Sequence, residues 1–349
     1  MRIRHVLPAA AAVAALLAPA AAQAATKPVY AGTPPNGALK GVPPTTLDNA
    51  FYPSTIKVHV GDSVDYKFVG FHNVFFPPKG KAAPGFALIN PAAPVSGAKD
   101  AGGADMWFNG QPSAAFNPLV AAPTGSKVIN GKGNHGSGLP SGPKFHYKVR
   151  FTKKGEFTYY CSIHPGMKAK VQVVAKSAKA SSKADDTKRI SKQGAAATKL
   201  AKKLVSAPPP AGNVVNVGND KKGVSSLAFF PATKTIKAGE SVTFQMPSAS
   251  TESHNVAVGP EPYVLGQTLE GPGGTLNPFV VYPSDPPTAP LPPLTPTTHG
   301  NGYLATGMLD TQKASPFPNK QTITFTTPGT YVYYCNIHQP DMKGTIVVQ

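Results

Sequence analysis

The sequence predicts an all-β protein made of two copies of one kind of domain. Its 349 residues include 39 prolines and 34 glycines but only 14% charged residues, a composition that suits short strands joined by turn-rich loops. The β-rich alternating segment 55–60 precedes a Gly-containing turn and a second such segment, and the same order recurs from residue 235. At about 150 residues per domain, the length also favours two domains.

The repeat continues along both halves of the chain. Phe71-His72-Asn73-Val74 is matched by Ser253-His254-Asn255-Val256. The glycine-rich segment 131–139 is matched by 300–308, the alternating strand 145–151 by 321–325, and the segment 155–174 by 329–348. We therefore expect two homologous all-β domains, over residues 46–175 and 213–349.

The first 24 residues have the pattern of an export signal. Arg2 and Arg4 form a basic start, residues 6–22 are apolar, and Ala22-Gln23-Ala24 is a small-residue cleavage site. A membrane anchor is the alternative, but the run is rich in alanine and interrupted by prolines. We expect an exported protein, secreted, periplasmic or held at the cell surface, with no transmembrane segment in the mature chain.

Two stretches lie outside the predicted domains. Residues 25–45 show little periodicity and are expected to form a flexible lead-in. Residues 176–212 form a basic, proline-rich linker, with nine Lys or Arg against two Asp between residues 176 and 203. This linker is either solvated and partly helical or disordered, or it contacts an anionic surface or partner.

Long insertions separate the repeated motifs within each half, over residues 76–123 and 259–299. They are rich in Pro, Gly, Ala and Asn and are expected to be loops. Within the first, Met106-Trp107-Phe108 either covers an apolar patch beside the first site or is buried in the core.

The only two cysteines occupy equivalent places in the repeats. The first copy contains Cys-x2-His-x2-Met and the second Cys-x2-His-x3-Met, and each has one more histidine upstream. Two cysteines in an exported protein ordinarily suggest a disulfide. Here each has its own histidines and methionine, which favours two separate metal sites, with the candidate ligands His72, Cys161, His164 and Met167, and His254, Cys335, His338 and Met342.

The ligand types indicate copper. Calcium and magnesium prefer oxygen ligands, and structural zinc sites use four cysteine or histidine ligands in paired spacings. A thiolate and two imidazoles with a weak thioether are the ligands of a blue-copper electron-transfer site. We expect two copper ions, one in each domain.

Both repeats resemble cupredoxins, the plastocyanin/azurin/amicyanin family of type 1 copper proteins, on the motifs quoted above. The resemblance covers about residues 46–174 and 214–349. It implies a Greek-key β-sandwich for each domain, with the eight residues above as metal ligands. It also implies that Asn73 and Asn255 brace the cysteine loops through hydrogen bonds. The first loop has the length seen in amicyanins, whereas the second has one more residue before Met342.

We expect an electron carrier rather than an enzyme. Two-domain copper oxidases and nitrite reductases need further copper ligands in His-Cys-His or His-x-His clusters, and neither pattern occurs in this sequence. Extracytoplasmic copper storage or delivery is the alternative. The net charge of +18 favours acidic redox donor and acceptor proteins, or an anionic cell surface contacted by the linker. An exported chain makes nucleic acid an unsuitable partner.

Overall fold

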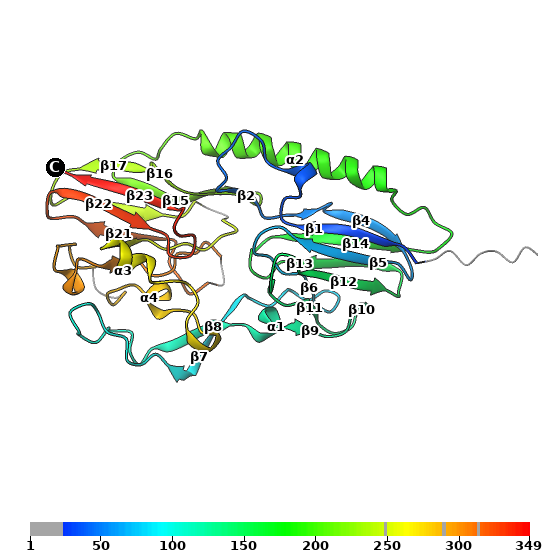
Figure 1. Cartoon of the computed structure of the whole chain (residues 1–349), viewed down its shortest axis with the longest axis horizontal. Coiled ribbons are helices and arrows are strands. Elements are labelled where there is room, and N and C mark those ends of the chain that lie inside the picture. The colour runs from blue at the N-terminus through cyan, green and yellow to red at the C-terminus, as the bar shows by residue number, and fades with distance from the viewer. Residues whose placement is uncertain (1–23, 248–249, 288–290, 313–314) are drawn as a thin grey trace, which may run out of the picture.

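The computed structural model describes residues 24–247, 250–287, 291–312 and 315–349. It contains two β-sandwiches side by side, with a long helix running along both (Figure 1). The all-β prediction is therefore confirmed. The proposed signal, residues 1–24, falls outside the described residues except for Ala24.

Two sheets form the first sandwich. One has the strand order β10 (Val128–Ile129), β12 (His146–Phe151), β5 (Ser63–Phe68), β1 (Thr26–Ala31) and β3 (Phe51–Tyr52). The other has the order β4 (Thr55–His59), β14 (Lys168–Val174), β13 (Gly155–Tyr160), β6 (Phe75–Phe76), β11 (His135–Ser137) and β9 (Pro123–Thr124). Alternate residues of both sheets are buried between them, among them Val64, Tyr66, Val149 and Val171.

The second sandwich repeats this plan. One of its sheets has the strand order β2 (Thr46–Asp48), β16 (Val224–Phe230), β15 (Val214–Lys221), β18 (Ser241–Gln245) and β21 (Lys320–Thr324). The other has the order β17 (Thr233–Ile236), β23 (Lys343–Val348), β22 (Gly329–Tyr334), β19 (Ala257–Val258) and β20 (Leu304–Ala305). In both halves the first strand pairs in parallel with the strand that precedes the upstream histidine, β1 with β5 and β15 with β18. The matching pairings show that the sequence repeat is also a structural repeat.

The remaining elements lie in the insertions and connections. They are the hairpin β7 (Ala87–Pro94) and β8 (Pro112–Phe116), the helices α1 (Pro118–Ala121), α2 (Lys183–Val205), α3 (Glu261–Leu265) and α4 (Pro278–Val281), and the 3-10 turns η1 (Pro35–Gly37), η2 (Pro272–Gly274) and η3 (Thr298–Gly300). Among the helices of the described residues, none is both long and apolar enough to span a membrane.

The prediction of a flexible lead-in over residues 25–45 is wrong for its first part. Residues 26–31 form β1, which pairs with β5 along its whole length, and Val29 and Ala31 are fully buried in the first core. Burial of these alternating apolar side chains and backbone pairing together outweigh the low β-propensity of Pro28. Residues 46–48 then form β2, which joins the sheet of the second sandwich by pairing with β16. Residue 46, the predicted start of the first domain, therefore lies in a strand of the second sandwich.

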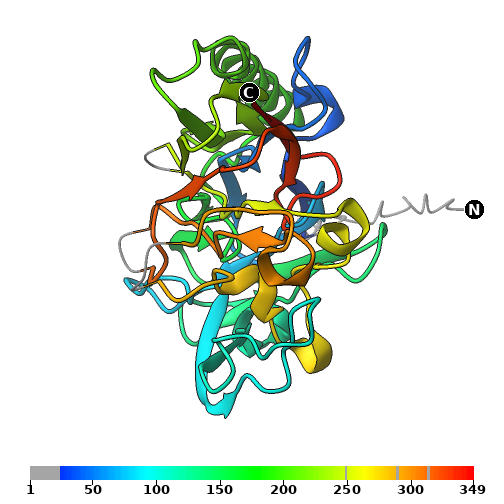
Figure 2. The same ribbon diagram turned by 90° about the vertical axis from the view of Figure 1, so that its left-hand side faces the viewer.

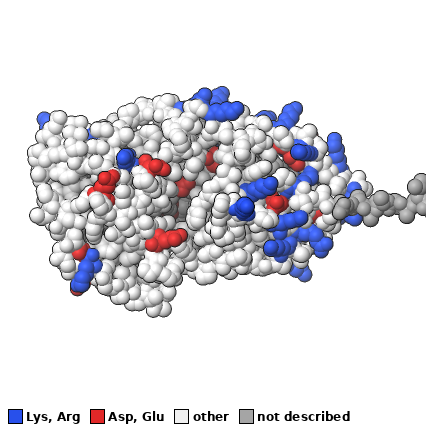
Figure 3. Space-filling view, viewed as in Figure 1, with Lys and Arg blue, Asp and Glu red and all other residues white. Residues whose placement is uncertain are grey.

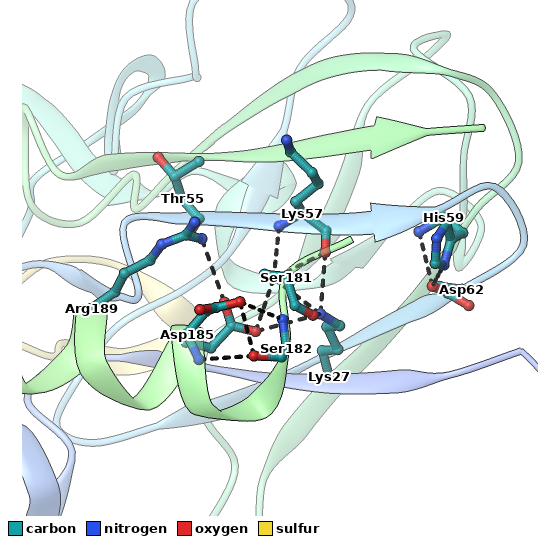
Figure 4. A network of polar contacts seen from close by, with 10 residues as sticks. Lys27, Thr55, Lys57, His59, Asp62, Ser181, Ser182, Asp185 and Arg189 are labelled. Atoms are coloured by element: carbon teal, nitrogen blue, oxygen red, sulfur yellow. Dashed lines mark hydrogen bonds and ion pairs between the residues drawn. The ribbon is translucent and has the colours of Figure 1, made fainter. Parts of the chain in front are cut away.

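Helix α2 lies in the predicted linker and packs on both sandwiches. It begins with a capping box in which Ser182 and Asp185 satisfy each other's backbone N–H groups. Near this end Lys27 contacts Ser181, whose hydroxyl donates to Lys57 O, and Arg189 reaches Thr55 O (Figure 4).

Further along α2, one face is buried against both sandwiches. Gly194 packs directly on Gly37 of η1, where an added Cβ would lie 2.4 Å from a backbone oxygen. Ala201 and Leu204 pack with Val224 of the second sandwich. The helix therefore ties the two sandwiches together, and only its other face is solvated as expected for a linker.

The insertion of the first sandwich also contacts the second one. Phe108 packs against Phe279 and Tyr282, with ring centroids 5.3 and 5.7 Å apart, and Trp107 Nε1 donates to Pro283 O. The interpretation that this segment is buried in a core is confirmed for Met106 and Phe108. That core is formed with aromatic side chains of the other insertion. The two sandwiches thus share β2, α2 and these aromatic contacts. Helix α2, in green, and the cyan insertion of the first sandwich lie on opposite sides of the molecule (Figure 2).

Charge is unevenly spread over the molecule. Lys and Arg side chains gather over the first sandwich and along α2, whereas the second sandwich is mostly uncharged on the same face (Figure 3). The positive charge of the chain is therefore concentrated on one half of this face.

Candidate metal centres

In the first sandwich, three predicted ligands come together at one end of the sheets. His72 lies between β5 and β6, Cys161 directly follows β13, and His164 lies in the loop to β14. The two Nδ1 atoms are 3.0 Å apart, and Cys161 Sγ lies 3.4 Å from His164 Nδ1 and 3.9 Å from His72 Nδ1. All three side chains are buried.

The second sandwich has the same arrangement. His254 Nδ1 and His338 Nδ1 are 3.1 Å apart, and Cys335 Sγ lies 3.7 and 3.5 Å from them. In each group the three ligand atoms lie within 4.8 Å of one another. Ligands about 2 Å from a shared ion in tetrahedral geometry are roughly 3.3 Å apart. The spacing in each group therefore fits one metal ion of its own.

The two methionines close the ligand loops. Cys161 N donates to Met167 O at 3.0 Å, and Cys335 N donates to Met342 O at 3.0 Å. Since both bonds are alike, the extra residue before Met342 is absorbed within the loop and leaves its backbone in the equivalent place. Both side chains are buried in the cores that contain the cysteines. Their role as axial ligands stays a prediction.

The two asparagines contact the residue after each cysteine. Asn73 Oδ1 accepts from Ser162 N at 2.7 Å, and Asn255 Oδ1 accepts from Asn336 N at 2.7 Å. Asn255 also donates to the Asn336 side chain at 2.9 Å. These bonds join the segment that carries the upstream histidine to the cysteine loop, which holds two ligands of each group in register.

Two glycines that sequence reasoning missed make room for the upstream histidines. A Cβ on Gly32 would lie 2.8 Å from His72 Nε2, and one on Gly218 would lie 2.7 Å from His254 Nε2. Both glycines have positive φ, +88° and +75°. A signal was present, because Pro28 to Gly32 (PVYAG) matches Val214 to Gly218 (VVNVG) as an extension of the repeat.

The pKa values of both cysteines are lowered, which favours the thiolate form that binds metal ions. Burial alone raises the pKa of Cys161, but the adjacent His164 and His72 outweigh it and lower that pKa to about 5. The pKa of Cys335 is likewise held well below its ordinary value by His338 and His254 against the effect of burial. Thiolates beside imidazoles in a closed pocket form the soft donor set that copper prefers.

A carboxylate lies between the two groups. Glu252 Oε1 is 3.4 Å from His164 Nε2, and Glu252 Oε2 is 3.5 Å from His338 Nε2. Burial alone raises the pKa of Glu252, but His164 and His338 outweigh burial and hold it below its ordinary value. The same three residues line a cavity of about 820 Å³ between the sandwiches. The sequence did not reveal Glu252, since Gly70 occupies its place in the first repeat.

Four other histidines are satisfied elsewhere. His59 Nε2 lies 2.9 Å from Ala178 O, and His146 Nδ1 lies 2.8 Å from Asp65 Oδ1. His135 contacts two backbone oxygens, and His299 lies between Asp285 and Asp100. Within the part of the chain that the structure describes, none of the four joins a three-residue metal-binding group.

The comparisons with known proteins agree with this donor set. Residues 215–349 match the family model described as copper binding proteins, plastocyanin/azurin family. No curated protein sequence matches the chain.

Solved structures of small copper proteins cover about one sandwich. A mutant plastocyanin of fern is 25% identical, with 39% of this chain and 99% of that chain covered and a TM-score of 0.22. A reduced Cu(I) form of a mutant amicyanin is 20% identical, with coverage of 42% and 89% and a TM-score of 0.22. Auracyanin A, a "blue" copper protein from Chloroflexus aurantiacus, is 23% identical, with coverage of 39% and 96% and a TM-score of 0.24.

The first sandwich repeats the strand pairing and the buried His-Cys-His group of the second, outside the residues that the family model matches. The second sandwich, over residues 215–349, therefore matches the plastocyanin/azurin family of copper-binding proteins.

Proposed function

We propose that the protein is an exported electron carrier with one type 1 copper site in each domain. The observation that carries the proposal is the duplicated buried group of one cysteine and two histidines, with converging ligand atoms. Copper bound there supplies one-electron transfer by alternating between Cu(I) and Cu(II). The protein holds the ligands in place through the asparagine bonds and the closed loops, so little rearrangement accompanies the change of oxidation state.

An electron carrier is favoured over an oxidase or nitrite reductase by the sequence around the ligands. Cys161 lies between Tyr160 and Ser162, and Cys335 between Tyr334 and Asn336, so neither cysteine has the flanking histidines that recruit further copper. The basic first domain and α2 are suited to acidic redox partners or an anionic cell surface. The amino-terminal pattern of a basic start, an apolar run and a cleavage site supports export.

Copper titration of the wild-type protein and two cysteine variants tests the proposal. We expect two copper ions per chain and an intense, reversibly bleached visible absorption from the thiolate–copper bond. Cys161→Ser and Cys335→Ser each remove one copper and about half of the absorption, and the double variant is colourless. A wild-type protein that holds Cu(I) but cannot be oxidised and reduced reversibly would instead indicate copper storage or delivery.

A further inference from the structure

The two candidate metal centres face each other across the interface between the sandwiches. In each, the histidine of the cysteine loop directs Nδ1 toward its own group, which leaves Nε2 on the opposite edge of the ring. These two Nε2 atoms, of His164 and His338, both lie against the carboxylate of Glu252, at 3.4 and 3.5 Å. One carboxylate therefore contacts a metal-binding histidine of each domain.

Glu252 is held in this place by its surroundings. It is 8% exposed, and Asn49 Nδ2 donates to its Oε1 at 2.6 Å. Asn49 follows β2, the strand that crosses into the second sandwich, and its own N–H donates to Gly223 O. Among the ion pairs of the described residues, His164 and His338 are the cationic partners of Glu252. A buried carboxylate needs such partners, so the position of Glu252 depends on both histidines together.

We infer that Glu252 is a positioning residue shared by both copper centres, which couples them into one unit. The inference rests on the proposed function, since it concerns the residues that hold the copper ions. A carboxylate that accepts the second N–H of a metal-binding histidine fixes the ring's tautomer and orientation and raises its basicity. Here the two oxygens of one side chain lie 3.4 and 3.5 Å from the Nε2 atoms of two such histidines, one in each centre. Glu252 also provides a direct polar connection between the centres, from His164 through the carboxylate to His338.

The inference predicts an effect that crosses the domain boundary. Although Glu252 belongs to the second repeat, Glu252→Gln should weaken copper binding in the first domain as well. We expect Cu(II) affinity to fall about 10- to 100-fold at both sites, the range for loss of a carboxylate behind a metal-binding histidine. Cu(I) affinity should fall less, because the lost negative charge stabilises the more highly charged ion more. The reduction potentials of both sites should therefore rise.

The two sites are measured separately in one-site variants, with Glu252→Gln added to Cys335→Ser for the first site and to Cys161→Ser for the second. Chelator competition gives each affinity, and spectroelectrochemical titration gives each potential. Glu270→Gln is the matched control, since Glu270 lines the same cavity but is exposed. It should change neither site. Ring ¹⁵N spectra of the metal-free protein add a readout without copper, in which Glu252→Gln shifts the Nε2 signals of both His164 and His338.

The outcomes separate the two proposals. If Glu252→Gln changes only the second site, or neither, the shared role is refuted while the electron-carrier proposal stands. If wild-type protein binds no copper at all, the proposed function fails instead. Should Glu252→Gln not fold, Asn49→Ala replaces it. That variant frees Oε1, the oxygen that faces His164, and should lower the affinity of the first site more than that of the second; equal affinities to wild type would refute the inference.

Discussion

Gly218 offers the most demanding test of how the second site is built. It lies at a bulge in β15 with φ +75°, and a Cβ there would lie 2.7 Å from His254 Nε2. Replacement by alanine has two separate effects. The left-handed backbone conformation costs about 1–2 kcal/mol for a residue with a Cβ. The imidazole must also move by roughly 0.8 Å or more to restore a normal contact distance.

Gly239 separates these effects. Its φ is +88°, but a Cβ at this position would have no neighbour within 4 Å. Both Gly218→Ala and Gly239→Ala should therefore lower the free energy of unfolding of the metal-free protein by about 1–2 kcal/mol in denaturant titrations. Only Gly218→Ala should also weaken copper binding at the second site, by at least about tenfold, because the ligand ring is displaced.

The copper measurement uses the Cys161→Ser background, in which only the second site binds. A Gly218→Ala protein with unchanged copper affinity and an unchanged absorption spectrum would refute the reasoning. It would mean that His254 is not a ligand, or that its ring is not confined by the glycine.

Three further predictions follow from local contacts. Gly194→Ala would normally stabilise a helix by about 0.5–1 kcal/mol, but here the Cβ meets Gly37 O at 2.4 Å, so we expect a loss of about 1–3 kcal/mol in thermal or denaturant unfolding. Asn255→Ala leaves the buried Asn336 N–H without its acceptor and should cost about 1–3 kcal/mol in the metal-free protein; an unchanged midpoint would contradict this. Because the pKa of Cys161 is lowered from 9.0 to about 5, its thiolate form stabilises the metal-free fold above pH 9.0, and this contribution declines as the pH falls toward about 5. Ultraviolet thiolate absorbance in the Cys335→Ser variant should persist down to that pH, and loss of the signal near pH 9.0 would show that the histidines do not stabilise the thiolate.

Much of the fold was predictable because the sequence contains an internal repeat. Alternating apolar residues recur in the same order in both halves, and one match supports the other. Strand β1 was not predicted from the sequence. It contains Pro28 and follows an alanine-rich run, so the alternation of apolar and polar residues extends over only a few positions. Its burial depends on the distant strand β5, a contact that local pattern does not show.

The ligands were predictable for a different reason. Cys161 and His164 are three residues apart, so a tight loop brings them together without knowledge of the rest of the fold. The role of Glu252 was not predictable in this way. Its contacts with His164 and Asn49 join residues 88 and 203 positions apart, and they exist only because the two sandwiches pack against each other. Such docking depends on side-chain packing, as at Gly194 and Gly37, rather than on periodicity.

The central claim is that each domain holds one blue copper. Integrated electron paramagnetic resonance of the oxidised, copper-loaded protein tests it most directly, because it counts Cu(II) ions and reports the geometry of each. The account predicts two Cu(II) per chain, both with the small hyperfine splitting of a thiolate-bound type 1 site, and one such signal after Cys335→Ser. A single type 1 signal in the wild-type protein, or a disulfide between Cys161 and Cys335 with no signal, would contradict it.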